Sequence, residues 1–384
     1  MSCHRLLMTI VAACVAACCT SAAAEIVVGV TLSATGPAAS LGIPEQRTFA
    51  VLPATLGGES VRYVVLDDGS DPTRASQNAR KLVQEHHADV LVGSSVTPPS
   101  LAIIDVAAEA ETPYISMASS AAIVSPMDAR RHWVFKVPQS EVLMAEAVVE
   151  HMKSAGIKSV GYLGFANPYG ETWSKEFRRL AEGSGMRLTA DERYAPSDTS
   201  VAAQVLKILG SSPDAVLIAA AGTPGATPHI ELVRRGYKGR IYQTHGVANA
   251  DFLRVGGKEV EGAILPASPV LVFEQLDDGN PVKKASQEYI ARYEQAYGSG
   301  SRNIYGSNAW DAYLLLKNAV AEARRAAAPG TPAFRRALRA ALEASREVVA
   351  TQGVFSMSPT DHNGLDKRAR VMVRVEQGKW ILLK

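Results

Sequence analysis

Apolar residues along the chain fall into short runs separated by stretches with helical spacing. Nearly continuous apolar runs are typical of strands covered on both faces in a parallel sheet. Such runs occur at 26–32, 61–66, 89–93 and 113–116. The helices expected between them span roughly 44–56, 72–86 and 98–110. This alternation predicts βαβ units with right-handed crossovers, and hence an α/β fold.

The same rhythm restarts after about residue 140. A helix is expected over 140–155, and strands are expected at 159–163, 215–218 and 240–243. Two sequential blocks of this kind predict two similar lobes, each built on a doubly wound parallel sheet. Helix-rich segments follow at 281–297, 305–327 and 332–344, and strands are expected at 370–375 and 380–383. Because these last strands need a sheet to join, we expect the chain to cross between the lobes.

The first 24 residues are interpreted as a cleaved secretory signal. A weakly basic start at His4 and Arg5 precedes the apolar segment 6–13, and Ser21-Ala-Ala-Ala24 resembles a signal-peptidase site. No other apolar run approaches the ~18–20 residues needed to cross a bilayer. We therefore expect an exported, soluble protein. Lipoprotein processing at Cys18 is the alternative, because residues 15–18 loosely match a lipobox.

Composition and charge narrow the classes of partner. The chain has 384 residues, of which 47% are hydrophobic and 20% are charged, as in ordinary soluble proteins. Its 40 Lys and Arg residues against 38 Asp and Glu residues give a net charge of +2, with no basic block. Nucleic acids and anionic membranes attract clustered positive charge, so neither is expected as a partner. Every cysteine lies in the predicted signal, so no disulfide or cysteine-based metal site is expected in the mature chain: Cys3, Cys14, Cys18 and Cys19.

Small hydroxyl residues follow two neighbouring strands of the predicted first sheet. Ser94, Ser95 and Thr97 come after the third strand, and Ser119 and Ser120 come after the fourth. In open α/β sheets, ligands bind beyond the carboxyl ends of the strands. Hydroxyl and backbone N–H groups near helix N-termini make an uncharged anion site. The pattern favours a carboxylate-binding site, although simple helix capping by these residues is the alternative.

Several segments also resemble the periplasmic branched-chain amino-acid-type (Leu/Ile/Val-binding-protein-like) solute-binding proteins of ABC transporters. They are VVGVTLSATGPAASLG from Val27, DDGSDPTRASQNARKLVQ, VGSSVTPPSLA, TPYISMASS and NPYGE, in order along nearly the whole mature chain. The resemblance implies the type I periplasmic binding fold, with two lobes that close on a small ligand at a three-stranded hinge. It also implies a periplasmic location, a membrane ABC permease as partner, a monomer, and no cofactor.

On this basis the chain is divided into a signal and two lobes. The signal covers 1–24, lobe 1 covers 25–139 plus 268–350, and lobe 2 covers 140–267 plus 351–384.

The resemblance assigns roles to particular residues. The serine loop, which contains Ser94 and Ser95, is expected to hold the ligand carboxylate. The loop 118–120 is expected to assist it. Leu41 is expected to cover the ligand, and Tyr169 to close on it from the second lobe. Near Gly222 and Thr223, other members have a further aromatic that is absent here. With Thr97 from the loop chemistry, the predicted ligand-binding residues are Leu41, Ser94, Ser95, Thr97, Ala118, Ser119, Ser120, Tyr169, Thr223 and His245.

His245 departs from the pattern of the amino-acid-binding members. There a glutamate in the loop "PEG" accepts the α-ammonium group of the ligand, whereas this chain has Thr244-His245-Gly246. A neutral imidazole lacks the negative charge, and a protonated one repels an ammonium. We therefore favour a carboxylate without an amine, such as a benzoate- or phenylpropanoid-type acid, because small residues at 221–223 leave room for a flat ring. An aliphatic or keto acid remains open, as does an amino acid whose ammonium another acidic residue accepts while His245 caps a helix.

Motifs of catalysis are missing from the sequence. No G-x-G-x-x-G follows the first strand, and P-loop, H-E-x-x-H and G-x-S-x-G motifs do not occur. We therefore expect a binding protein with no catalytic residue, no cofactor and no metal. An exported sensor that acts through a separate partner is a third class, since this fold also serves in receptors.

Two further features are given simpler interpretations. His86-His87 at a helix end is more typical of a favourable C-terminal charge than of a metal pair. Asp67-Asp68, followed by Gly69 at the end of a strand, is interpreted as a turn or a cap.

Overall fold

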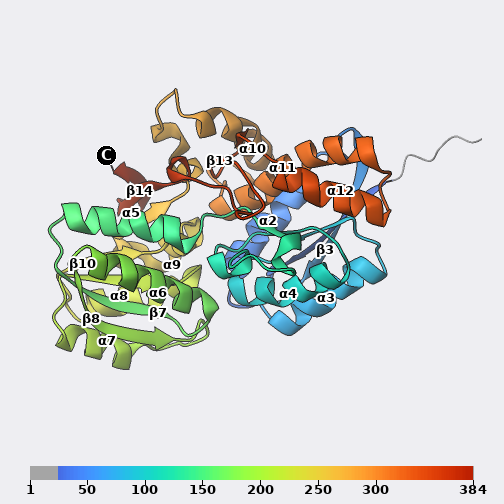
Figure 1. Cartoon of the computed structure of the whole chain (residues 1–384). Coiled ribbons are helices and arrows are strands. Elements are labelled where there is room, and N and C mark those ends of the chain that lie inside the picture. The colour runs from blue at the N-terminus through green and yellow to red at the C-terminus, as the bar shows by residue number, and fades with distance from the viewer. Residues whose placement is uncertain (1–24, 384) are drawn as a thin grey trace, which may run out of the picture.

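The computed structural model describes residues 25–383. The predicted signal peptide with its four cysteines, and Lys384, lie outside the described residues. Figure 1 shows two α/β lobes side by side, one built largely from the blue N-terminal part of the chain and the other from the green and yellow part. Within residues 25–383, no helix has the length and apolar character needed to cross a membrane.

The first lobe is built on a six-stranded sheet. Its strand order is β2-β3-β1-β4-β5-β6, and all neighbours pair in parallel except β2 with β3. The strands are β1 (Ile26–Leu32), β2 (Thr55–Leu56), β3 (Glu59–Asp67), β4 (Val90–Gly93), β5 (Tyr114–Ser116) and β6 (Val134–Lys136). The helices around it are α2 (Ala39–Val51), α3 (Pro72–Gln84), α4 (Thr97–Glu109), α11 (Ile304–Ala326) and α12 (Pro332–Glu343). Every residue of β1 is buried, as its apolar run predicts.

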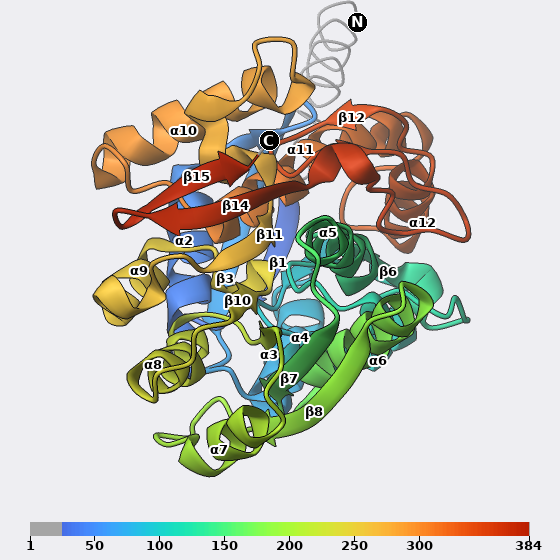
Figure 2. The ribbon, with the colours of Figure 1, turned by 90° about the vertical axis from the view of Figure 1, so that its left-hand side faces the viewer.

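The second lobe is built on a seven-stranded sheet with the order β15-β14-β11-β10-β9-β7-β8. The strands are β7 (Ser159–Phe165), β8 (Arg187–Tyr194), β9 (Ala215–Ala219), β10 (Arg240–Gln243), β11 (Ile264–Ala267), β14 (Val371–Glu376) and β15 (Lys379–Leu383). Its helices are α5 (Glu141–Ser154), α6 (Pro168–Gly183), α7 (Ala202–Gly210), α8 (Ala226–Arg234) and α9 (Ala250–Gly256). Figure 2 shows β14 and β15 running beside β11, where they extend the parallel sheet as antiparallel edge strands.

The remaining regular elements lie near the passages between the lobes. They are helix α10 (Pro281–Tyr297) and the hairpin of β12 (Val348–Val349) and β13 (Val354–Phe355). The chain passes from one sheet to the other after β6, after β11 and between β13 and β14. A fold of two parallel-sheet lobes joined by three passages is therefore confirmed.

One predicted helix was misplaced. The sequence pattern suggests a helix over 44–56, but α2 begins at Ala39, and Thr55 and Leu56 pair with β3 instead. The small residues at the start of α2 carry no helical periodicity, yet they allow α2 to lie close to the loop after β1. A Cβ atom on Gly42 would lie 2.1 Å from the carbonyl oxygen of Ser33. Strand β8, which the sequence analysis missed, is a polar edge strand without an apolar run.

The predicted lobe boundaries remain a prediction. Phe355 and Met357, which we assigned to lobe 2, belong to the buried core of the first sheet. The ring of His362 stacks on Phe135 at a centroid distance of 4.2 Å, so the chain stays with the first lobe at least this far. This packing favours placing the last passage between the lobes after about residue 365 rather than at 350.

Candidate ligand-binding cleft

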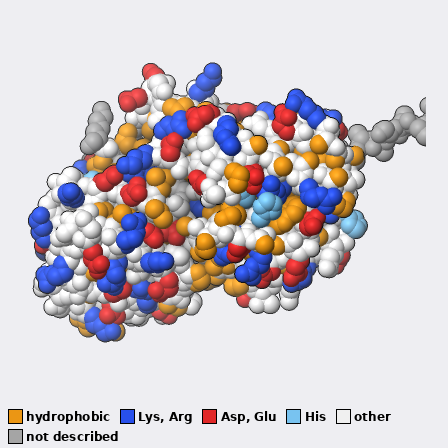
Figure 3. All heavy atoms as spheres, viewed as in Figure 1, with side chains coloured by type: hydrophobic (Ala, Val, Ile, Leu, Met, Phe, Trp, Pro, Cys, Tyr) orange, Lys and Arg blue, Asp and Glu red, His pale blue; other side chains and the backbone are white. Residues whose placement is uncertain are grey.

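A cavity of about 180 Å³ lies between the lobes, where the ends of strands from both sheets meet. Figure 3 shows hydrophobic side chains gathered at the junction of the two lobes. Among the described residues that line the cavity, none is Asp, Glu, Lys or Arg. Seven of the predicted ligand-binding residues line it: Leu41, Ser95, Thr97, Ala118, Ser119, Tyr169 and His245.

The serine loop after β4 presents two hydroxyl residues to the cavity. Ser95 lines it, and its Oγ accepts a hydrogen bond of 3.0 Å from the backbone N–H of Ser33. Thr97 lines it as the first residue of α4, and its hydroxyl is buried without a hydrogen-bond partner in the described part of the chain. The helix dipole of α4 adds partial positive charge at this point. Together these groups can bind an anion without a formal charge of their own.

Ser94 lies behind the cavity rather than in its wall. Its hydroxyl donates a 2.6 Å hydrogen bond to Asp68, and the residue is fully buried. The geometry therefore does not support the prediction that Ser94 faces the cavity, because its one hydroxyl hydrogen is donated to Asp68. The interpretation of Asp67-Asp68 as a turn holds for both residues, because Asp67 accepts from the N–H of Gly69 and Asp68 from the N–H of Ser70, each at 2.9 Å.

Asp68 also has a second role, which the sequence did not indicate. It is fully buried and also accepts hydrogen bonds from the hydroxyls of Ser33 (2.8 Å) and Thr31 (3.3 Å). Burial raises the pKa of this carboxyl, while the hydrogen bonds from Ser94 and Ser33 act in the opposite direction. Asp68 therefore fixes the loops after β1 and β4 relative to each other.

Glu45 is a second buried carboxyl behind the serine loop, and it also was missed. It lies on α2, is fully buried, and is hydrogen-bonded to Ser95 Oγ. Burial raises the pKa of Glu45 well above its ordinary value, and the negative charge of Asp68 adds to the rise. On a helix of mixed composition, nothing in the sequence distinguishes this glutamate from a solvent-exposed one.

The neighbouring loop after β5 contributes Ala118 and Ser119 to the cavity, whereas Ser120 bridges the lobes. Ser120 Oγ accepts from the N–H of Ala122 at 3.3 Å and lies 3.3 Å from Thr172 Oγ1 on α6. Its predicted role in ligand contact is thus replaced by a contact between the two lobes, because the side chain caps the short 3-10 turn Ala121–Ile123.

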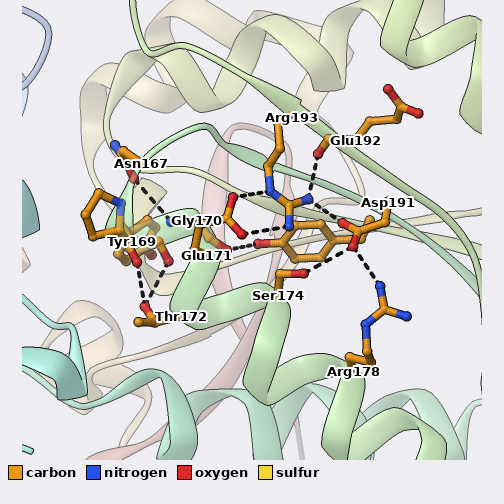
Figure 4. A network of polar contacts seen from close by, with 12 residues as sticks. Asn167, Tyr169, Gly170, Glu171, Thr172, Ser174, Arg178, Asp191, Glu192 and Arg193 are labelled. Atoms are coloured by element: carbon orange, nitrogen blue, oxygen red, sulfur yellow. Dashed lines mark hydrogen bonds and ion pairs between the residues drawn. The ribbon is translucent and has the colours of Figure 1, made fainter.

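Tyr169 reaches the cavity from the first turn of α6, and a polar network holds that turn in place (Figure 4). The side chain of Asn167 accepts from the N–H of Gly170 at 3.2 Å, and Tyr162 donates a 2.6 Å hydrogen bond to the Gly170 carbonyl. The guanidinium of Arg193 lies 4.9 Å from the centre of the Tyr162 ring. Tyr169 itself donates to Thr244 Oγ1 at 2.8 Å, so its ring is fixed at both ends.

His245 begins the short 3-10 helix after β10 and is 5% exposed. Its ring centre lies 5.9 Å from that of Trp173. Both ring nitrogens are buried, with no hydrogen-bond partner among residues 25–383. Burial, together with the nearby charge of Lys136, lowers the pKa of His245 to about 3. The imidazole is therefore neutral at physiological pH and brings no charge to the cavity wall.

Thr223 lies outside the cavity wall, while its neighbours Ala221 and Pro224 line it. The loop turns at Gly222, whose φ is 65°, and Thr223 begins the 3-10 helix Thr223–Gly225, which also contains Pro224. The sequence correctly indicates small residues here, but not which of them faces the ligand space.

Amide side chains from the hinge complete the floor of the cavity. Gln139, Asn308 and Gln352 all line it, and they come from three distant segments. Gln139 Nε2 donates to the carbonyls of Ala369 (2.7 Å) and Gln352 (3.1 Å). Gln352 Nε2 in turn donates to Asn308 Oδ1 at 2.6 Å. The sequence analysis missed this network, because its members lie far apart in the chain and follow no motif.

In the part of the chain that the structure describes, no cluster of three or more His, Cys, Asp or Glu side chains could hold a metal ion.

Comparisons with known proteins agree with this geometry. A family model described as "Periplasmic binding protein" matches residues 25–379. An extracellular ligand-binding receptor from Rhodopseudomonas palustris HaA2 is 47% identical, with a TM-score of 0.91 over 94% of this chain and 100% of that chain. The Leu/Ile/Val-binding protein homolog 3 of Brucella melitensis biotype 1 is 24% identical over 272 residues, which cover 68% of this chain and 72% of that protein.

A more distant solved structure shares the fold. It is a solute binding protein of an ABC transporter from Rhodopseudomonas palustris BisB5, in complex with 3,4-dihydroxybenzoic acid. It is 19% identical, with a TM-score of 0.78 over 94% of this chain and 96% of that chain.

Proposed function

Because the chain belongs to the periplasmic binding protein family, and within it to the type I, Leu/Ile/Val-binding kind, we propose that this solute-binding protein captures a small carboxylic acid between its lobes. It delivers the acid, as a periplasmic monomer, to a membrane ABC permease. The observation that carries the choice of ligand is the uncharged cavity wall, in which neutral His245 stands where an amine-binding carboxylate is expected.

The carboxylate of the ligand is assigned to the start of α4. Ser95 and Thr97 offer hydroxyls there, and the helix dipole favours negative charge. The buried Thr97 hydroxyl has no partner within residues 25–383, so a ligand oxygen at hydrogen-bonding distance would satisfy it. An unsatisfied buried hydroxyl is unfavourable by ~1–3 kcal/mol, which gives the bound acid a direct energetic advantage.

The rest of the ligand is assigned to an apolar space of one-ring size. Leu41, Met117 and Phe165 line it with Tyr169 and Pro224. A cavity of roughly 150 Å³ holds benzene, so about 180 Å³ suits a single ring with a short acid side chain. The favoured ligands are benzoate- or phenylpropanoid-type acids. The complex of a protein of the same fold with 3,4-dihydroxybenzoic acid supports this class.

An amino acid is the second candidate, because a curated relative is named a Leu/Ile/Val-binding protein homolog. Binding of its ammonium would require an ionised carboxylate in the cavity wall. Glu45 is hydrogen-bonded to Ser95, but it is fully buried and its raised pKa favours the uncharged form. These observations favour the acid without an amine.

A thermal-shift screen tests the ligand class directly. A ligand that binds only the folded protein raises the melting temperature by mass action, with ~2.7 kcal/mol of added stability at 100 times Kd. We expect benzoate, phenylacetate or 3-phenylpropanoate to stabilise the mature protein more than leucine or valine. Preferential stabilisation by leucine or valine would contradict the proposal. Recovery of the ligand unchanged after prolonged incubation would exclude turnover, as expected for a carrier.

A further inference from the structure

Two buried carboxyl groups, Asp68 and Glu45, lie behind the serine loop and are hydrogen-bonded to Ser94 and Ser95. Asp68 accepts from Ser94 Oγ at 2.6 Å and from Ser33 Oγ at 2.8 Å. A serine hydroxyl has one hydrogen, so neither of these serines has a hydrogen left for the cavity. Ser95, which borders the cavity, is the loop serine whose hydrogen remains to be assigned.

The direction of the Ser95 hydroxyl depends on the protonation of Glu45. Ser95 Oγ accepts from the N–H of Ser33 at 3.0 Å and is hydrogen-bonded to Glu45 Oε2. An ionised Glu45 can only accept, so it would take the Ser95 hydrogen and leave a lone pair towards the cavity. A protonated Glu45 would donate to Ser95 Oγ, and the Ser95 hydrogen would then be free to bind a ligand.

The surroundings of Glu45 favour the protonated form. Its Oε1 is buried without a hydrogen-bond partner in the described part of the chain. The ionisable groups that act on it or that it acts on are Asp68, just after β3, and Tyr305 from α11. Both are acids rather than cations, and Arg47 of α2 is exposed at the surface. Burial therefore raises the pKa of Glu45 more than its hydrogen bond with Ser95 lowers it.

We propose that Glu45 is a positioning residue, which as a neutral carboxylic acid donates to Ser95 Oγ and so makes the Ser95 hydroxyl a donor to the carboxylate of the ligand. This inference rests on the proposed function, since it needs an anionic group at the start of α4. Ionisation of Glu45 removes the donor and adds a negative charge beside the ligand. Affinity for an acid is therefore expected to fall as the pH rises above the pKa of Glu45, by up to tenfold per pH unit.

The proton on Glu45 can be observed without any ligand. In infrared spectra at pH 7, a protonated carboxyl has a carbonyl band distinct from that of a carboxylate. We expect one such band in the mature protein to disappear in the Glu45→Gln variant. Retention of all protonated-carboxyl bands in this variant would show that Glu45 is ionised and would overturn the inference.

The second measurement is the Kd of benzoate between pH 6 and pH 9, by calorimetry on the mature protein. Once the pH exceeds the pKa of Glu45, affinity of the wild type should fall, while that of Glu45→Gln should stay flat, because the amide donates to Ser95 at every pH. A fall in affinity that both proteins show equally would overturn the inference. Failure of benzoate to bind either protein would count against the proposed function alone, and the infrared result would still decide the state of Glu45.

Lys136 is the group that could imitate this effect. It is fully buried, its Nζ donates to the Pro138 carbonyl at 2.6 Å, and burial lowers its pKa to about 7. If this charge acted on the ligand, its loss would also weaken acid binding at higher pH. We expect the Lys136→Met variant to keep the pH-dependent fall in affinity. A flat curve for Lys136→Met, together with a sloping curve for Glu45→Gln, would assign the titration to Lys136 and refute the role of Glu45.

Discussion

Leu41 and Gly222 face each other across the cleft at a distance that leaves no room for a side chain on the glycine. A Cβ atom on Gly222 would lie 2.8 Å from Leu41 Cδ1. Leu41 lies on α2 of the first lobe, and Gly222 follows β9 of the second. This contact therefore joins the two lobes across the cleft.

We expect Gly222→Ala to lower the affinity for the acid ligand by about tenfold, since crowding of the new methyl group against Leu41 opposes closure by ~1–3 kcal/mol. Calorimetry of ligand binding measures the loss. Gly185→Ala is the matched control, because Gly185 also has a positive φ, of 77°, but nothing lies within 4 Å of its Cβ position. Equal losses of affinity in the two variants would attribute the effect to backbone strain and not to the contact with Leu41.

Substitution of His245 tests the choice of ligand class. His245→Glu places a carboxylate in a wall that otherwise lacks formal charge among the described lining residues. Repulsion between this group and the ligand carboxylate should reduce acid affinity tenfold or more, and His245→Gln should reduce it less. Binding constants for benzoate and for leucine decide the matter. Unchanged benzoate affinity in His245→Glu would point to a purely structural histidine.

The two adjacent serines of the loop should respond differently to removal of the hydroxyl. Ser95→Ala removes a donor to a charged ligand group, and such bonds contribute ~1.5–3 kcal/mol, so affinity should fall about 10- to 100-fold. Ser94→Ala takes one hydrogen-bond donor from the buried carboxyl of Asp68. We therefore expect Ser94→Ala mainly to lower the free energy of unfolding, by ~1–3 kcal/mol. Titration calorimetry and urea unfolding of both variants separate the two roles, and a similar loss of affinity in both would contradict them.

Lys136 should make the stability of the protein depend on pH. Its pKa is about 7 in the folded chain, against 10.5 for an ordinary lysine, because burial disfavours the charged form. Between these values the unfolded chain binds more protons, so the free energy of unfolding rises with pH from about 7 towards 10.5.

Lys136→Met removes this dependence. We expect the variant to be more stable than the wild type at pH 6, by on the order of a few kcal/mol, and the difference to shrink by pH 9. Urea unfolding at both pH values measures it. A difference in stability that is the same at pH 6 and pH 9 would show that Lys136 keeps an ordinary pKa.

The sequence was a good guide to the elements and a partial guide to the site. Strands that are covered on both faces, such as β1, have apolar runs that mark them clearly. Asp71 and Pro72 likewise start α3 as expected, with the Asp71 side chain accepting from the N–H of Arg74 at 2.7 Å. These signals are local, since they depend on neighbours within a few residues. The edge strand β8 lacks such a signal because one side of it meets solvent.

Within the site, the loops could be predicted from the sequence, but which of their side chains point into the cavity could not. Ser94 and Ser95 are equivalent in the sequence, and only the position of Asp68 and Glu45 separates their roles. Those carboxyls lie 26 and 50 residues away from their partner serines in the chain. Buried polar contacts over such separations depend on the assembled fold, so no periodic pattern in the sequence predicts them.

The hydrogen bonds of Gln139 and Gln352 have a consequence for how this protein can change over evolutionary time. These amides belong both to the pivot about which the lobes would turn and to the floor on which the ligand rests. A substitution that adapts the floor to a new compound also alters the stiffness of the pivot. A substitution in the floor therefore changes ligand selectivity and the rate of lobe opening together. New ligands are more readily accommodated by substitutions in the side walls of the cavity than by substitutions in its floor.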